Sequence, residues 1–336
     1  MRAMTFVAAN EPLVAEDRTT PTPGPGDVRI RVEACGVCHS DHFIGQALWP
    51  DLELPRVPGH EVVGTVDALG DGVTQYAAGD RVGLGWHGGH DGTCSRCMSG
   101  KFIHCDNAAV TGISRDGGYA EYAIAPAVAL ARVPAEMDAK LAAPLLCAGV
   151  TTYNALRNAD ARPGDLVAIQ GLGGLGHLGV QFARAMGFEV AAVSRGSDKA
   201  SFAHELGAHH YIDAKAGDPA AALTERGGAK VILATAPHAP SISGLVGGLG
   251  VEGSLIVVGA PFEPLQIGAV DLISRDASVR GWSSGTGSDS TDCLRFAHEQ
   301  GVKAMIEPYP LANAQAAYDR MMSGDARFRV VLDVAS

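Results

Sequence analysis

Two patterns of apolar and polar positions follow one another along the chain. Residues 1–150 contain short runs in which apolar side chains alternate with polar ones, bounded by glycine and proline, as in 28–38 and 60–70. A period of two residues is typical of strands that bury one face. We therefore predict a β-rich domain for this part of the chain.

From about residue 151 the pattern changes to short apolar runs that alternate with segments of helical spacing. The runs LVAIQ (166–170) and EVAAVS (189–194) flank the helical segment LGVQFARAMG (178–187). Strands and helices in alternation predict an α/β fold with a doubly wound parallel sheet. The alternation ends near residue 282, and the tail predicts a helix and a strand that rejoin the first domain. The predicted domains are therefore 1–150 with 283–336, and 151–282.

Composition and charge narrow the class of protein. The 336 residues suffice for two domains, and 46% hydrophobic with 19% charged residues is typical of a compact folded chain. The formal net charge of −11 repels phosphate backbones, which argues against nucleic-acid binding. Because no run of 18 apolar residues and no long apolar N-terminal stretch occurs, we expect no membrane association and a cytoplasmic location.

A glycine-rich turn directly after LVAIQ predicts a dinucleotide site. Gly171, Gly173 and Gly176 form G-x-G-x-x-G between a predicted strand and a predicted helix. In a Rossmann domain the first glycine allows the turn, the second admits the pyrophosphate, and the third lets helix and strand approach. We expect the helix N-terminus, with Gly174 and Leu175, to bind the phosphates.

The end of the next predicted strand bears on which dinucleotide is bound. NAD sites usually place Asp or Glu there, whereas this chain has Ser194 and Arg195, with Lys199 one turn later. A hydroxyl and a guanidinium suit a 2′-phosphate, so NADP(H) is favoured and NAD(H) stays open. Arg195 can instead stack on the adenine or point into water.

Seven cysteines are present, and in a reducing compartment clustered thiols bind metal more often than they form disulfides. Cys94, Cys97 and Cys105 form such a cluster. Cys38, His60 and Cys147 are far apart, and their spacing alone does not join them. A lone cysteine in an apolar run is usually a small core residue.

The chain resembles the zinc-containing medium-chain alcohol dehydrogenases over essentially its whole length. The matching segments are CGVCHSDH, PRVPGHEVVGTV, the 91–105 loop, GGYAEY, APLLCAGVTTYNAL, GLGGLGHLGVQFARAMG and RFRVVLD. The resemblance implies a GroES-like catalytic domain plus the Rossmann domain. It also implies hydride transfer between a nicotinamide cofactor, for which the residues after the glycine motif favour NADP(H), and a primary or secondary alcohol or carbonyl.

By the same resemblance, Cys38, His60 and Cys147 hold a catalytic zinc whose fourth position is open to water or substrate. Asp41 orients the ring of His60, and Glu61 lies behind the metal. A plain surface carboxylate is the alternative for Glu61.

Family members with a structural zinc use four cysteines at C-x2-C-x2-C-x7-C. This chain keeps the spacing but begins it with a carboxylate, so the expected ligands are Asp91, Cys94, Cys97 and Cys105. Zinc accepts oxygen ligands. His87 or His90 could replace Asp91, and a loop without metal is the remaining alternative.

The resemblance assigns further roles near the reacting atoms. Ser40 occupies the proton-relay position, although it can equally cap a helix. The histidine that often ends this relay is replaced by Phe43, and either His42 or water can take its place. By the same resemblance, His39 and Arg329 contact the phosphates of the cofactor. Trp86, Trp49 and Tyr119 are expected to line the substrate pocket.

An apolar pocket suits a substrate with an apolar or aromatic substituent. Two other classes share the fold: zinc-free quinone or enoyl reductases, which lack these ligands, and non-enzymatic cofactor-binding proteins, which have no need of a zinc pocket. The expected partners are a small alcohol or carbonyl substrate and further copies of the chain, in a homodimer or homotetramer.

Overall fold

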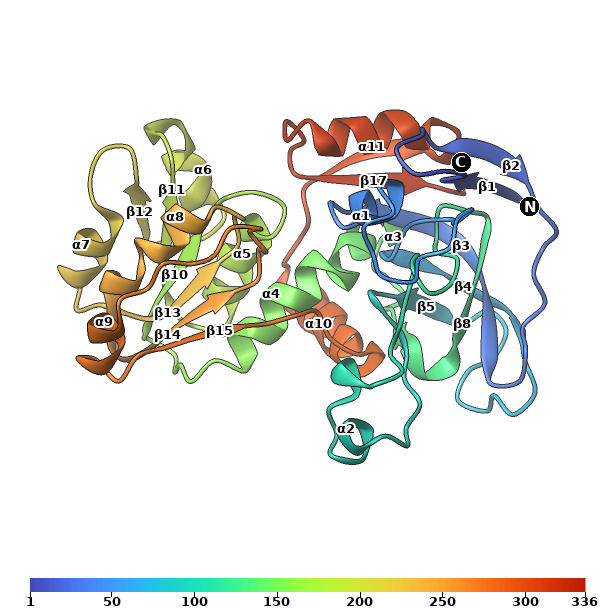
Figure 1. Cartoon of the computed structure of the whole chain (residues 1–336), viewed down its shortest axis with the longest axis horizontal. Coiled ribbons are helices and arrows are strands. Elements are labelled where there is room, and N and C mark those ends of the chain that lie inside the picture. Colours follow the sequence, from blue (N-terminus) through green and yellow to red (C-terminus); the bar gives the residue numbers. More distant parts are fainter. Residues whose placement is uncertain (336) are drawn as a thin grey trace. The chain divides into compact units, whose positions relative to one another are not determined.

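The computed structural model describes residues 1–335, which fold as two compact units (Figure 1). The first unit contains Met1–Val150 together with the chain from Ser284 onward, and the second contains Thr151–Ser283. Each unit has its own sheet and its own hydrophobic core.

The first unit is built on a seven-stranded sheet in the order β16-β17-β3-β4-β5-β9, with β8 paired to β3. Val28, Ile30 and Val32 of β3 are buried and alternate with more exposed residues, as the period of two predicted. The strands are β3 (Asp27–Val37), β4 (Val62–Leu69), β5 (Arg81–Leu84), β8 (Tyr122–Pro126), β9 (Leu130–Arg132), β16 (Ile306–Pro310) and β17 (Arg329–Asp333).

The C-terminal tail returns to this sheet. After α11 (Ala314–Met322), β17 pairs in antiparallel fashion with β3 and in parallel with β16. The shorter elements of the unit are β1 (Arg2–Thr5), β2 (Val14–Asp17), α1 (Asp41–Gly45), β6 (His87–Gly89), α2 (Ser95–Met98), β7 (Ala109–Val110) and α3 (Ala139–Ala142).

The second unit is a six-stranded parallel sheet in the order β12-β11-β10-β13-β14-β15, which confirms the doubly wound fold. Its strands are β10 (Leu166–Gln170), β11 (Glu189–Ser194), β12 (His210–Asp213), β13 (Ala229–Ala234), β14 (Leu249–Val257) and β15 (Ser278–Gly281). Its helices are α5 (Gly176–Ala185), α6 (Ala200–Glu205), α7 (Pro219–Thr224), α8 (Ala239–Ser243) and α9 (Ala269–Ile273), and α4 (Ala148–Arg157) begins within the first unit. From β10 the chain first forms β11 and β12 on one side, and it later forms β13, β14 and β15 on the other side. The strand order therefore reverses at β10, and sheets of this kind bind ligands at the carboxyl end of the strands where the order reverses.

The longest helix, α10 (Gly287–Gln300), has defined signals at both ends. Thr286 and Asp289 form a reciprocal capping box, and Gly301 ends the helix in the left-handed conformation with φ of +71°. Among the helices of residues 1–335, none combines the length and the apolar content that crossing a bilayer requires.

Candidate metal and cofactor sites

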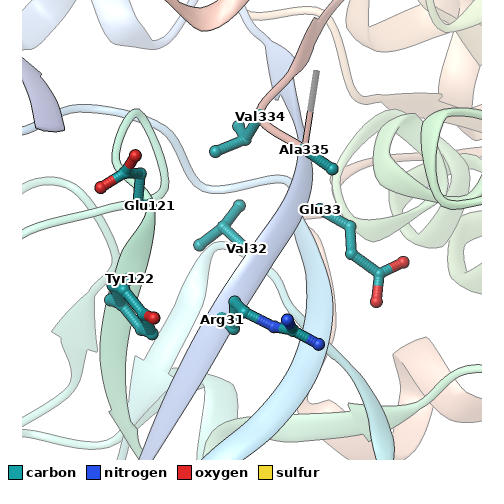
Figure 2. A pocket seen from close by; sticks show the side chains of 7 residues that line it. All are labelled: Arg31, Val32, Glu33, Glu121, Tyr122, Val334 and Ala335. Carbon is teal, nitrogen blue, oxygen red and sulfur yellow. The ribbon is translucent and has the colours of Figure 1, made fainter. Parts of the chain in front are cut away.

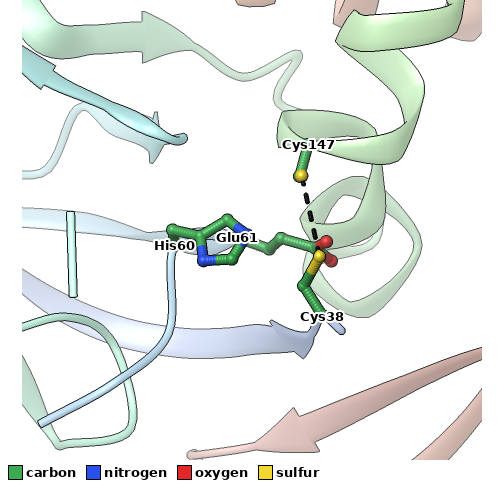
Figure 3. A group of neighbouring side chains, drawn as sticks. All are labelled: Cys38, His60, Glu61 and Cys147. Atoms are coloured by element: carbon green, nitrogen blue, oxygen red, sulfur yellow. Dashed lines mark hydrogen bonds between the residues drawn. The ribbon is translucent and has the colours of Figure 1, made fainter. Parts of the chain in front are cut away.

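The first unit gathers a buried cluster from three distant parts of the sequence (Figure 3). Cys38 follows β3, His60 precedes β4, and Cys147 lies at the start of α4. One ligand atom from each of these residues, and one from Glu61, all lie within 4.8 Å of one another. The fold thus brings together positions that the spacing of the sequence did not join.

The distances within this cluster fit a shared metal ion. The Sγ atoms of Cys38 and Cys147 are 3.9 Å apart. A disulfide would require about 2.05 Å, whereas two thiolates bound to tetrahedral zinc at about 2.3 Å lie roughly 3.8 Å from each other. The Nε2 atom of His60 is buried and has no hydrogen-bond partner among residues 1–335. A buried imidazole nitrogen in this state is suited to metal ligation.

The buried carboxylate of Asp41 contacts both Cys38 and His60. Asp41 in α1 is fully buried, and its Oδ1 lies 3.2 Å from Nδ1 of His60. Its Oδ2 accepts hydrogen bonds from the backbone N–H of Cys38 and from the Tyr119 hydroxyl, each at 2.9 Å. Asp41 therefore places a carboxylate within ion-pair distance of Nδ1 of His60 and leaves Nε2 as the other ring nitrogen for a metal, although neither Nδ1 nor Oδ1 makes a hydrogen bond among residues 1–335.

The prediction that Tyr119 lines the substrate pocket is wrong. Its side chain is 0% exposed and belongs to the hydrophobic core of the first unit. The ring packs so closely on Gly59 that a Cβ added there would lie 2.4 Å from a ring carbon. Because the hydroxyl donates to Asp41, Tyr119 supports that carboxylate and has no surface free for a substrate.

Trp86 and Trp49 lie next to the buried cluster and form an apolar wall beside it. The Trp86 ring meets the His60 ring edge-on, with centroids 5.0 Å apart, and Trp49 meets Trp86 at 5.6 Å. Trp86 is half-buried and Trp49 is 36% exposed. Both rings therefore present apolar surface next to a candidate metal ligand.

Glu61 and Arg329 form a buried ion pair at the same cluster. The Arg329 guanidinium contacts Oε1 of Glu61, while Oε2 has no partner among residues 1–335. Burial raises the pKa of Glu61 to about 7, against the opposing charge of Arg329. The structure places Arg329 beside the cluster, and its contact with cofactor phosphates stays a prediction.

The surroundings of Cys38 favour its ionised form. The hydrogen bond between the sulfur atoms of Cys147 and Cys38 lowers the pKa of Cys38. The charges of His60 and Arg329 act in the same direction, against the cost of burial. A thiolate is the form of cysteine that ligates metals. The same hydrogen bond, followed by burial, raises the pKa of Cys147, so one of the two sulfur ligands is poised as a thiolate and the other as a thiol.

The start of α1 carries the residues predicted for proton transfer. Ser40 is the N-cap residue, but its side chain makes no capping hydrogen bond. Nδ1 of His42 lies 2.7 Å from the hydroxyl of Tyr318 in α11, a partner that the sequence did not reveal. Burial lowers the pKa of His42, and the charge of His39 acts in the same direction. The ring centroids of the two histidines are 5.8 Å apart.

A second cluster is local to the loop between β6 and β7. Ligand atoms of Asp91, Cys94, Cys97 and Cys105 all lie within 4.8 Å of one another. The Sγ atoms of Cys94 and Cys105 are 3.8 Å apart, again the separation of two thiolates on one zinc. The four donors therefore also fit a metal ion.

The structure groups Asp91, and neither nearby histidine, with the three cysteines. Nδ1 of His90 lies 3.2 Å from Nε2 of His87, and the His90 ring stacks on Phe102 at 4.4 Å between centroids. The two imidazoles are therefore engaged with each other, and the carboxylate remains as the fourth donor.

The glycine motif has the geometry that each glycine was predicted to supply. Gly171 has φ of +91°, and a Cβ on Gly176 would lie 1.9 Å from the carbonyl oxygen of Gly171. A Cβ on Gly173 would meet nothing within 4 Å, so the backbone there is open to a ligand. None of the backbone N–H groups of Gly173, Gly174 and Leu175 donates to an acceptor within residues 1–335. This cradle at the start of α5 fits a pyrophosphate.

The segment after β11 has no carboxylate at the position of Ser194 and Arg195. Ser194 is buried, while the Arg195 side chain is exposed and has no hydrogen-bond or ion-pair partner in the described part of the chain. Lys199 lies at the N-terminus of α6. The backbone between them is held by Asp213, which accepts the Gly196 N–H at 2.8 Å.

A surface hollow of about 450 Å³ lies elsewhere on the first unit, along β3 and β8 (Figure 2). It contains no predicted site residue and no member of either cluster. Its lining residues are Arg31, Val32, Glu33, Glu121, Tyr122, Val334 and Ala335.

Comparisons with known proteins agree with the two units. The alcohol dehydrogenase GroES-like domain matches residues 24–135, and the zinc-binding dehydrogenase model matches 174–333. The alcohol dehydrogenase patD of Penicillium expansum is 47% identical over 95% of this chain and 94% of its own length. The alcohol dehydrogenase notN of Aspergillus sp. (strain MF297-2) is 44% identical over 97% and 96%.

The solved structure of a cinnamyl alcohol dehydrogenase from Sorghum bicolor is 34% identical, with a TM-score of 0.89 over 100% of this chain and 98% of that chain. These matches confirm the predicted family and the combination of GroES-like and Rossmann domains. The chain therefore belongs to the zinc-type medium-chain dehydrogenase family, whose members are oxidoreductases that act on alcohols with zinc and a nicotinamide cofactor.

Proposed function

We propose that this protein is a zinc-dependent, NADP(H)-linked dehydrogenase of alcohols and reductase of the corresponding carbonyls. The observation that carries the proposal is the buried cluster of Cys38, His60 and Cys147, with its 3.9 Å sulfur separation and its unpartnered imidazole nitrogen. Zinc held by these residues would supply a Lewis acid for the oxygen of the alcohol or carbonyl.

The side chains around the cluster have separate tasks in this reaction. Asp41 keeps Nδ1 of His60 engaged, and Trp86 and Trp49 offer apolar surface to the substituent of the substrate. The Ser40 hydroxyl, which makes no capping bond, would accept the alcohol proton at Oγ. His42 is the proposed acceptor for the release of that proton to water.

We test the metal site with the Cys38→Ala variant and with Cys293→Ala as a matched control, since Cys293 is a buried cysteine outside both clusters. Cys38→Ala should lose one zinc ion and turnover with a panel of alcohols and aldehydes, while it still binds NADPH. Cys293→Ala should keep both. Full turnover of Cys38→Ala would contradict the proposal.

We propose NADP(H) as the preferred cofactor, bound by the glycine motif, with Ser194, Arg195 and Lys199 at the 2′-phosphate. The support is an exposed guanidinium without an internal partner and the lack of a carboxylate at the end of β11. His39 and Arg329 are the proposed contacts of the pyrophosphate.

The cofactor preference is tested with Arg195→Asp, and the exposed Arg226→Asp of the same unit is the control. One lost charge-assisted contact should lower kcat/KM for NADPH by roughly 10- to 100-fold and leave NADH nearly unchanged. An unchanged ratio of the two cofactors in Arg195→Asp would remove the basis for NADP(H).

We also propose that the loop cluster holds a second, structural zinc, and that the chain forms homo-oligomers. Strand β15 is an unpaired sheet edge, and α9 beside it in the sequence exposes Val270 and Ile273, each at 76%. Sedimentation of the wild type should therefore give a dimer or tetramer, and Val270→Glu should shift it toward the monomer. A wild type that sediments as a monomer would contradict this part of the proposal.

A further inference from the structure

Asn107 connects the two ends of the loop that carries the second cluster. Its side-chain Nδ2 donates to Oδ2 of Asp91 at 2.6 Å, and its backbone N–H donates to Sγ of Cys105 at 3.3 Å. The backbone N–H of Asp91 also donates to Sγ of Cys105, at 3.4 Å. A single residue outside the proposed ligand set therefore contacts both its first and its last member.

The hydrogen bonds to Asp91 distinguish its two oxygen atoms. Oδ1 accepts the backbone N–H groups of Thr93 at 2.8 Å and of Cys94 at 3.0 Å. Oδ2 accepts the amide of Asn107 at 2.6 Å. The Cys97 thiol also hydrogen-bonds the carboxylate, and it gives up that proton when it ligates a metal. A carboxylate oxygen offers two lone pairs, so the backbone uses both lone pairs of Oδ1, and Oδ2 keeps one for a metal. Oδ2 is the oxygen left to bind a metal.

We propose that Asn107 is a positioning residue that makes the Asp91 carboxylate the fourth ligand of the loop metal, through Oδ2. The inference rests on the proposed second zinc and adds the ligating atom and the residue that orients it. Backbone N–H groups hold Oδ1 of Asp91, but Oδ2 on this partly exposed loop can still bind water in place of a metal. A thiolate in the same place has a single donor atom and no plane to orient. Side chains that hold a ligand from behind typically change metal affinity by about 10- to 100-fold when they are removed.

The test measures the rate at which full-length, zinc-loaded protein releases its zinc to an excess of EDTA. The Cys97→Ser variant identifies the phase that belongs to the loop metal. In Asn107→Ala this phase should be about tenfold faster or more, and the release from the buried cluster should keep its wild-type rate. Asp106→Ala is the control, because it removes the neighbouring side chain, whose ion pair with Arg96 is 2.8 Å long, without touching Asp91.

The double variant Asp91→Cys/Asn107→Ala separates positioning from general support of the loop. A thiolate needs no amide to orient it, so the double variant should release zinc as slowly as the wild type. If it releases zinc as fast as Asn107→Ala, or if Asn107→Ala releases zinc at the wild-type rate, the proposed role of Asn107 is overturned. If the wild type holds one zinc and Cys97→Ser removes none, the loop metal itself is overturned, and the inference falls with it.

Discussion

The two clusters of metal-binding side chains are built in opposite ways. Cys38, His60 and Cys147 come from three distant parts of the chain and are held in place by the sheet of the first unit and by Asp41. The loop cluster lies within fifteen consecutive residues, 91–105, whose only regular elements are α2 and one short 3-10 helix (Phe102–His104). If each cluster holds the proposed metal, we therefore expect the buried cluster to keep its scaffold when the metal is removed and the loop to lose its conformation.

This contrast assigns different consequences to the loss of each metal. Under the proposed function, chemistry depends on the buried cluster, where Cys38, His60 and Cys147 would leave one ligand position open beside the apolar wall. Stability of the loop would depend on the other cluster, where Asp91 and the three cysteines would close the site. Variants in the two clusters should therefore separate turnover from stability.

The largest effect on turnover is expected for His60→Ala. Without this ligand the Lewis acid is lost or misplaced, which is worth several kcal/mol, and kcat should fall by roughly 10³-fold or more. The melting temperature should change little, since the sheet and Asp41 remain. The measurement is steady-state kinetics with thermal unfolding, and His298→Ala, an exposed histidine of the same unit, is the control. If His60→Ala keeps turnover within tenfold of the wild type, the buried cluster is not the centre of the chemistry.

A smaller effect is expected for Asp41→Asn. The amide cannot hold Nδ1–H of His60 and the backbone N–H of Cys38 as a carboxylate does. Zinc affinity at the buried cluster should fall by about 10- to 100-fold, with the loop zinc unaffected. Competition with a colorimetric chelator measures both sites. An equal loss of both zinc ions would show that Asp41 supports the whole unit rather than one cluster.

A smaller change still is expected for Tyr119→Phe, which removes one hydrogen bond to Asp41 at 2.9 Å. Zinc affinity at the buried cluster should fall by roughly 2- to 10-fold, and KM for the alcohol should stay the same, because Tyr119 has no exposed surface. If the KM of Tyr119→Phe differs from that of the wild type by an amount that depends on the size of the alcohol, Tyr119 lines the substrate pocket after all.

The smallest effect on turnover is expected for Cys97→Ser, in the loop cluster. Here kcat should stay within about threefold of the wild type, while the melting temperature falls by several degrees and protease cleaves within 91–105. Limited proteolysis followed by mass spectrometry locates the cleavage. A loss of turnover as large as that of His60→Ala, at a temperature where the protein stays folded, would contradict the division of roles.

The sequence predicted the features that are local along the chain. The glycine motif, the spacing of Cys94, Cys97 and Cys105, and the alternation of strands and helices all depend on neighbouring residues. Position 91 was open between a carboxylate and two histidines, because the contacts that favour Asp91, the stacking of His90 on Phe102 and its approach to His87, cannot be inferred from the sequence.

Features that depend on contacts across the fold were not predictable from residue patterns. The buried cluster was inferred from a family resemblance, since nothing in the spacing joins its members. His42 and Tyr318 are 276 positions apart, and Glu61 and Arg329 are 268 apart. Tyr119 was assigned to the pocket from the same resemblance, and the sequence does not reveal its burial or its hydrogen bond to Asp41 across 78 positions.

The central claim is that Cys38, His60 and Cys147 hold one metal ion. Anomalous X-ray diffraction from crystals of zinc-loaded protein, collected at the zinc absorption edge, tests it most directly. The account predicts an anomalous peak within about 2.0–2.4 Å of Sγ of Cys38, Nε2 of His60 and Sγ of Cys147. A map with no peak among these three atoms, in crystals whose loop site is occupied, would contradict it.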